Sequence, residues 1–96
     1  MSTVHVKKLN ELTFEVTVED RTPTIHTVNV TLDYAAKLSG SRMSVDQLLM
    51  RSFEFLLQRE ANTSILRSFD LAVISRYFPE YEREMMKLPK QSDTNT

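Results

Sequence analysis

The chain has 96 residues, enough for one domain with a modest hydrophobic core. Its 12 basic and 13 acidic residues nearly balance, which excludes a strong overall attraction to nucleic acid or to a membrane surface. The lack of cysteine excludes disulfides and thiolate metal sites, and a single glycine excludes a glycine-rich phosphate loop.

The first third of the chain is predicted to form strands. In residues 12–19, apolar side chains alternate with threonine and glutamate, which is the period of a half-buried strand. Residues 26–32 alternate in the same way, and the polar segment that ends at Pro23 suits a hairpin between the two strands. Val4 and Val6 indicate a shorter strand before them. We therefore expect an antiparallel sheet of two or three strands with one apolar row facing a core.

Two helices are predicted next. A short helix over residues 32–38 is expected to be capped by Thr31 or Asp33 and ended by Gly40, since glycine readily adopts the left-handed conformation found at helix ends. A capping box follows at Ser44 and Gln47, where each residue can hydrogen-bond the backbone N–H of the other. This second helix is expected to run to residue 59 or 60. Its predicted apolar stripe consists of Val45, Leu48, Leu49, Phe53, Leu56 and Leu57.

The last third is also predicted to be helical. Asp70 fits the N-cap of a helix over residues 71–78, and residues 80–88 fit a final short helix. Residues 89–96 lack an apolar anchor and are expected to form a disordered tail, which leaves residues 1–88 as one domain. The predicted fold is therefore α+β, with a two- or three-stranded antiparallel sheet at the N-terminus packed against three or four C-terminal helices.

Catalytic chemistry is not indicated. The only two histidines, His5 and His26, fall in predicted strands, and no nucleophile with an orienting group is associated with them. His26 belongs to the inward apolar row, where a histidine is usually a packing residue. No spacing of histidines and carboxylates indicates a metal site. We therefore expect a protein that is not an enzyme and that carries no cofactor or metal.

The sequence also bears on location. The first residues lack a basic segment followed by an apolar one, so no secretion signal is expected. No apolar run approaches the roughly 20 residues that a membrane span needs. The expected compartment is the cytoplasm, with no membrane partner.

The order of strand, short helix, glycine turn and capped helix over residues 26–58 resembles the ribbon-helix-helix family of DNA-binding repressors and antitoxins. In that family, two copies pair their strands in the major groove, and alternate polar strand residues read base edges. The resemblance implies that Thr27, Asn29 and Thr31 contact bases, that the backbone at Ser44 holds a phosphate, and that Arg42 adds charge. The alternative, which we favour, is an ordinary hairpin packed on a helix.

The segment of residues 52–82 resembles small bacterial single-domain proteins of uncharacterised function, a resemblance that implies no activity. This segment is rich in aromatic residues, which contribute strongly to both cores and interfaces. We expect Phe55, Tyr77, Tyr81 and Arg76 to form an interaction surface. The leading hypothesis is a non-catalytic protein–protein interaction module that self-associates as a homodimer. The alternative is a DNA-binding regulator of the ribbon-helix-helix kind.

Overall fold

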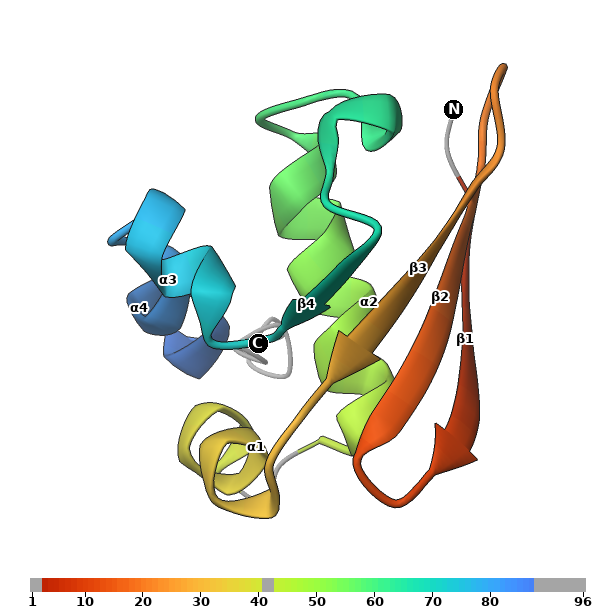
Figure 1. Cartoon of the computed structure of the whole chain (residues 1–96). Coiled ribbons are helices and arrows are strands. Elements are labelled where there is room, and N and C mark those ends of the chain that lie inside the picture. Colours follow the sequence, from red (N-terminus) through yellow and green to blue (C-terminus); the bar gives the residue numbers. More distant parts are fainter. Residues whose placement is uncertain (1–2, 41–42, 88–96) are drawn as a thin grey trace, which may run out of the picture.

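A computed structural model describes residues 3–40 and 43–87 of the chain (Figure 1). The sheet forms one layer and the helices lie together on one side of it (Figure 1), so the expected α+β class is confirmed. The expected tail, residues 89–96, lies outside the described residues. The elements in chain order are β1 (Thr3–Asn10), β2 (Thr13–Glu19), β3 (Thr24–Asn29), α1 (Leu32–Ser39), α2 (Val45–Leu57), a 3₁₀ turn (Asn62–Ser64), β4 (Ser68–Asp70), α3 (Val73–Tyr77) and α4 (Tyr81–Lys87).

The sheet has four strands in the order β1-β2-β3-β4. β1, β2 and β3 form the expected antiparallel meander, but β4 pairs in parallel with β3, so the prediction of two or three antiparallel strands was incomplete. Two backbone hydrogen bonds flank the added strand, from Thr27 N to Arg67 O at 2.7 Å and from Leu71 N to Asn29 O at 2.9 Å. A strand of three residues is too short to show a sequence period, and only its position beside β3 makes it a strand.

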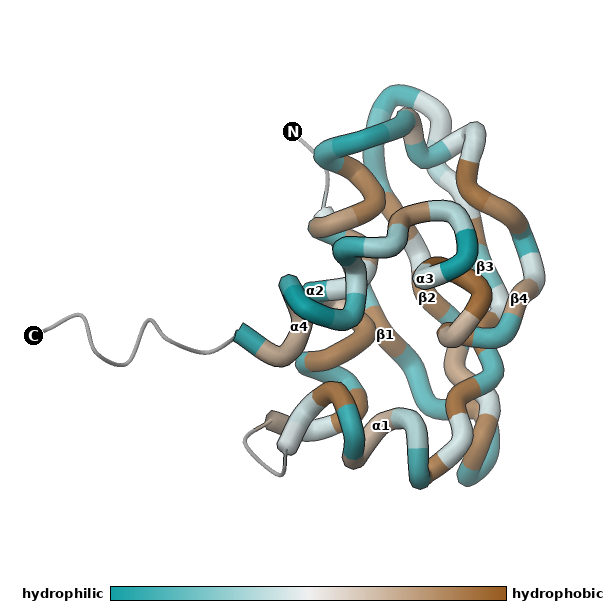
Figure 2. The backbone as a smooth tube through the Cα atoms, turned by 90° about the vertical axis from the view of Figure 1, so that its left-hand side faces the viewer, coloured by the Kyte–Doolittle hydropathy of each residue, from teal (hydrophilic) through white to brown (hydrophobic). Residues whose placement is uncertain are grey.

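The face of the sheet that meets the helices carries the predicted apolar row. In the register of β2 and β3, Val16 lies opposite His26 and Phe14 opposite Val28, and all four are buried. Hydrophobic and hydrophilic residues alternate along the strands (Figure 2), as the period of two requires. Leu12 departs from the prediction because it lies in the turn after β1 and is 45% exposed.

Helix α2 covers this face. Four residues of its predicted stripe, Leu48, Leu49, Phe53 and Leu56, are buried, whereas Val45 and Leu57 are only partly buried. The predicted capping box is confirmed, with Gln47 N donating to Ser44 Oγ at 3.2 Å and Ser44 N donating to Gln47 Oε1 at 3.1 Å. The helix ends at Leu57, two or three residues earlier than expected.

The ends of α1 also follow the prediction. The Thr31 side chain accepts a hydrogen bond from Tyr34 N, and Gly40 ends the helix with φ of 58°. The prediction for Asp70 was wrong. Asp70 ends β4 instead of capping a helix, and α3 begins at Val73 after Ala72, because pairing with β3 keeps residues 68–70 extended.

Within residues 3–40 and 43–87, no helix is both long enough and apolar enough to cross a membrane.

Candidate functional site

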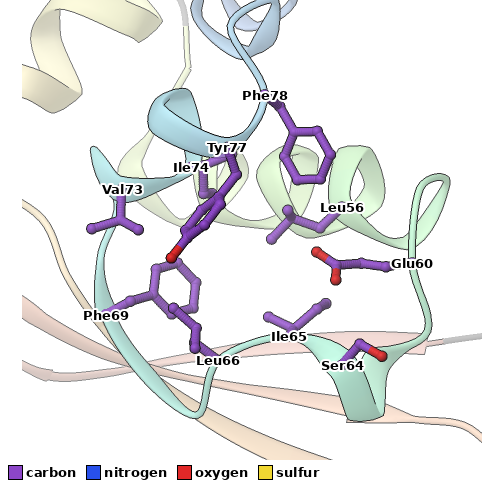
Figure 3. Close-up of a pocket in the computed structure, with 10 residues that line it drawn as sticks. All are labelled: Leu56, Glu60, Ser64, Ile65, Leu66, Phe69, Val73, Ile74, Tyr77 and Phe78. Atoms are coloured by element: carbon purple, nitrogen blue, oxygen red, sulfur yellow. The ribbon is translucent and has the colours of Figure 1, made fainter.

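A cavity of about 290 Å³ lies between the C-terminal end of α2 and helix α3 (Figure 3). Eight of its ten lining residues are aliphatic or aromatic, and Glu60 is the only charged one. We call it the apolar pocket. Its lining consists of Leu56, Glu60, Ser64, Ile65, Leu66, Phe69, Val73, Ile74, Tyr77 and Phe78.

The pocket has a buried base and an exposed rim. Ile65, Phe69 and Ile74 belong to the hydrophobic core and are at most 8% exposed. Leu66 and Tyr77 are 49% and 66% exposed, and Figure 3 shows the Tyr77 ring reaching from α3 toward Phe69 and Leu66. A large apolar side chain can therefore reach core residues from solvent without opening the fold.

The rim segment at Leu66 is held in place by the sheet. The buried His26 ring donates through Nδ1 to the Leu66 carbonyl at 2.7 Å. Its Nε2 lies 2.8 Å from Thr24 Oγ1, which also accepts from Asn62 Nδ2 at 2.9 Å. Since the Leu66 carbonyl can only accept, His26 carries its proton on Nδ1, and Thr24 donates to Nε2. This chain of hydrogen bonds fixes residues 62–66 against β3 and so shapes one wall of the pocket.

The opposite wall includes Phe78, which stacks edge to face with Phe55 at a centroid distance of 5.8 Å. The Arg59 guanidinium lies 3.6 Å above the Phe55 ring, and its Nε pairs with Glu80 at 3.2 Å. Arg59 also donates to the Phe55 carbonyl at 3.0 Å. Arg59 therefore contacts Phe55 and Glu80 outside the pocket. These contacts stabilise the wall of the pocket, and Arg59 does not pair with Glu60.

Two of the four residues expected to form the interaction surface lie elsewhere. Phe55 and Tyr81 are buried in the core, where their rings pack at 5.3 Å, and the Tyr81 hydroxyl lies 2.6 Å from Ser52 Oγ. Burial raises the pKa of Tyr81 well above its ordinary value. Neither side chain is accessible to a partner, so their inclusion in the surface is corrected.

The other two expected residues, Tyr77 and Arg76, are exposed on α3, and Tyr77 lines the pocket. The sequence pattern did not single out Glu60, Ile65 or Leu66. Their apolar or acidic character is unremarkable in the sequence, and only the pairing of β4 with β3 brings them opposite α3.

The residues expected to contact DNA do not form a free strand row. Thr27 and Asn29 lie on β3, which is paired with β2 on one side and β4 on the other. Asn29 Oδ1 already accepts from Thr13 Oγ1 at 3.0 Å, whereas Thr31 and Ser44 cap helices. Arg42 lies outside the described residues. In this fold, a second copy could pair with β3 only after β2 or β4 was displaced, so the geometry does not favour the ribbon-helix-helix function.

Among the described residues, no group of three or more histidine, aspartate or glutamate side chains is arranged to hold a metal ion. The chemistry that the pocket offers is apolar contact, one carboxylate, and the hydroxyl groups of Ser64 and Tyr77. No protein-family model, curated protein or solved structure matches this chain. Both resemblances drawn from the sequence therefore stay predictions.

Proposed function

We propose that this protein is a non-catalytic protein–protein interaction module that takes an apolar side chain of a partner protein into the apolar pocket. The observation that carries the proposal is the exposed rim of Tyr77 and Leu66 above a cavity floored by core residues. Interfaces derive most of their binding energy from a few aromatic or aliphatic anchors that fill such hollows.

The size of the pocket supports a side chain as the occupant. Pockets for drug-sized molecules and cofactors range from roughly 300 to 1,000 Å³. At about 290 Å³, this cavity falls just below that range, and it opens to solvent along the Tyr77 rim. One leucine or phenylalanine side chain suits it better than a nucleotide or a flavin does, and the nearly uniform apolar lining would leave the polar groups of such a cofactor without partners.

Tyrosine is among the residues most enriched at interface hot spots. Because Tyr77 is 66% exposed, burial of its ring contributes little to the stability of the fold. A partner side chain in the pocket would bury the ring, and that burial would contribute to binding. We therefore assign Tyr77 the largest share of the binding energy, and Leu66 a smaller one.

The test uses peptides displayed on phage and selected on the full chain. Binding of the enriched peptides is then measured with the wild type, with Tyr77→Ser, and with Leu32→Ser as the matched control. Leu32 is also 66% exposed but lies on α1, outside the pocket. We expect Tyr77→Ser to weaken binding about tenfold or more, in line with a hot-spot residue, and Leu32→Ser to leave it unchanged. Failure to enrich any peptide, or equal affinity for the wild type and Tyr77→Ser, would refute the proposal.

Self-association, the form of interaction expected from the sequence, is one outcome of the same design. If the partner is a second copy, sedimentation equilibrium shows a concentration-dependent dimer in the wild type and Leu32→Ser, and a monomer in Tyr77→Ser. If the wild type is monomeric while the selected peptides still bind at the pocket, the partner is a different protein.

A further inference from the structure

The charge at the pocket points to the chemistry of its partner. Glu60 follows α2, and Figure 3 shows its carboxylate pointing into the cavity between Leu56 and Ile65. The side chain is half-buried, and within the described ranges no lysine, arginine or histidine pairs with it. Its neighbour in the sequence, Arg59, is held by Glu80 and by the Phe55 carbonyl.

An unpaired carboxylate beside apolar walls interacts more strongly with an incoming charge than a fully solvated one does, because the walls lower the local dielectric. When a partner closes over the pocket, the same walls remove water from the carboxylate. Binding then costs desolvation energy unless the partner supplies a cation or donors. Selection of the partner therefore depends on what it places next to Glu60.

We propose that the apolar pocket selects a basic peptide segment, in which an apolar anchor side chain fills the cavity and a neighbouring lysine or arginine pairs with Glu60. This inference rests on the proposed function. An acidic segment is rejected, since it would bring a second negative charge to a carboxylate that lacks a counterion. Arginine is the favoured cation because its planar group can form two hydrogen bonds to one carboxylate.

The probe is a set of three synthetic peptide panels that share a central leucine or phenylalanine. The residues on either side of this anchor are arginine in the first panel, glutamine in the second and glutamate in the third. Affinities are measured at low and high salt for four proteins: the wild type, Glu60→Gln, Glu60→Lys and Glu11→Gln. Glu11 is an exposed glutamate in the turn after β1 and is not among the residues that line the pocket. Glu11→Gln therefore reproduces the change in net charge without changing the pocket.

With the wild type and with Glu11→Gln, the arginine panel should bind roughly three- to fivefold more tightly than the glutamine panel at low salt, as expected for a partly exposed ion pair. The preference should fall at high salt because counterions screen it. Glu60→Gln should abolish the preference, and Glu60→Lys should reverse it in favour of the glutamate panel.

The outcomes separate the inference from the function beneath it. If all three panels bind the wild type equally and all lose affinity in Tyr77→Ser, the pocket binds peptides but Glu60 selects no charge, and the inference is overturned. A preference for arginine that survives in Glu60→Gln would overturn it as well. If no panel binds the wild type, both the proposed function and the inference fail.

Discussion

Acidification should lower the free energy of unfolding of this protein through the protonation of one buried histidine, His26. His26 is fully buried between β2 and the 62–66 segment, and both of its ring nitrogens are engaged by Thr24 and by the Leu66 carbonyl. The ring also packs against Phe53 at a centroid distance of 5.2 Å. The burial of His26 outweighs the hydrogen bond that its ring donates to the Leu66 carbonyl, so protonation of His26 would place a poorly compensated charge in the core.

The direction of the effect follows from the pKa of His26. Burial lowers this pKa below 6.5, and the nearby positive charge of Arg67 lowers it further, against the opposing effect of the hydrogen bond to the Leu66 carbonyl. As the pH falls through 6.5, the unfolded chain takes up a proton at His26 more readily than the folded chain does. The stability contributed by the neutral histidine is therefore complete above that pH and is lost below it.

The magnitude can be worked out for a modest pH change. Between about pH 7.5 and about pH 5.5, a histidine with an ordinary pKa in the unfolded chain gains about 0.8 of a proton. Linkage therefore limits the fall in the free energy of unfolding to at most about 1.4 kcal/mol, the value reached when the folded chain gains no proton at this histidine in this range. That is a large fraction of the stability of a small domain. The lower pH of this range stays above the ordinary pKa of carboxylates. The pKa of Glu80 is lowered mainly by a hydrogen bond from its own backbone and also by Arg59. The pKa of Glu82 is lowered by Tyr34 and Lys37.

The assay is urea unfolding at the two pH values, followed by circular dichroism. All proteins carry His5→Gln, which removes the exposed histidine that lies 3.5 Å from Glu19. In this background, His26→Gln should unfold at lower urea but lose the pH dependence. If His26→Gln does not fold, the nitrogen-15 chemical shifts of the imidazole report directly on the folded His5→Gln protein. Equal stability at both pH values, or a His26 ring that titrates near 6.5 in the folded state, would refute the reasoning.

Two further predictions concern the buried hydrogen bond between Tyr81 and Ser52 and the backbone conformation of Gly40. Tyr81→Phe should lower the free energy of unfolding by about 1 kcal/mol, because Ser52 Oγ keeps its hydrogen bond to the Leu48 carbonyl at 2.7 Å. Ser52→Ala should lower it more, by up to about 3 kcal/mol, because the buried Tyr81 hydroxyl then loses its partner. Chemical denaturation of both variants tests this order, and a larger loss for Tyr81→Phe would contradict it. Gly40→Ala should lower stability by about 1 kcal/mol, because alanine is strained at a φ of 58°. Ala36→Gly, on the exposed face of α1, serves as the control for helix propensity, and unchanged thermal stability of Gly40→Ala would contradict the strain.

The features that the sequence predicted correctly are those set by neighbouring residues. The alternation in residues 13–19, the capping box at Ser44 and the glycine stop at Gly40 each depend on a few adjacent positions, and each is confirmed. Strand β4 and the start of α3 could not be predicted in this way. The Ser68–Asp70 segment becomes a strand only because β3 offers it a free edge, and Phe69 is buried there against Phe53 at 6.1 Å.

In the candidate site, too, the features that depend on tertiary structure could not be predicted from adjacent residues. Aromatic content drew attention to Phe55, Tyr77 and Tyr81 together, but burial separates them, since the side chains of Phe55 and Tyr81 face the core while Tyr77 faces solvent. The pocket itself is made from α2, the 62–66 segment, β4 and α3, which meet only in the folded chain. The tertiary structure therefore places Glu60 among apolar residues of the pocket, and the residues next to it in the sequence do not indicate this.

The late position of β4 has a consequence for synthesis on the ribosome. Strands β1 to β3 emerge first, and their apolar row has no cover until α2 follows. Even then, the edge of β3 that β4 will occupy is bare until residues 68–70 leave the exit tunnel. A stalled or prematurely terminated chain would thus present an unpaired strand edge, the feature that most readily recruits other nascent chains into aggregates. Chains truncated before residue 68 should therefore be removed by chaperones and proteases.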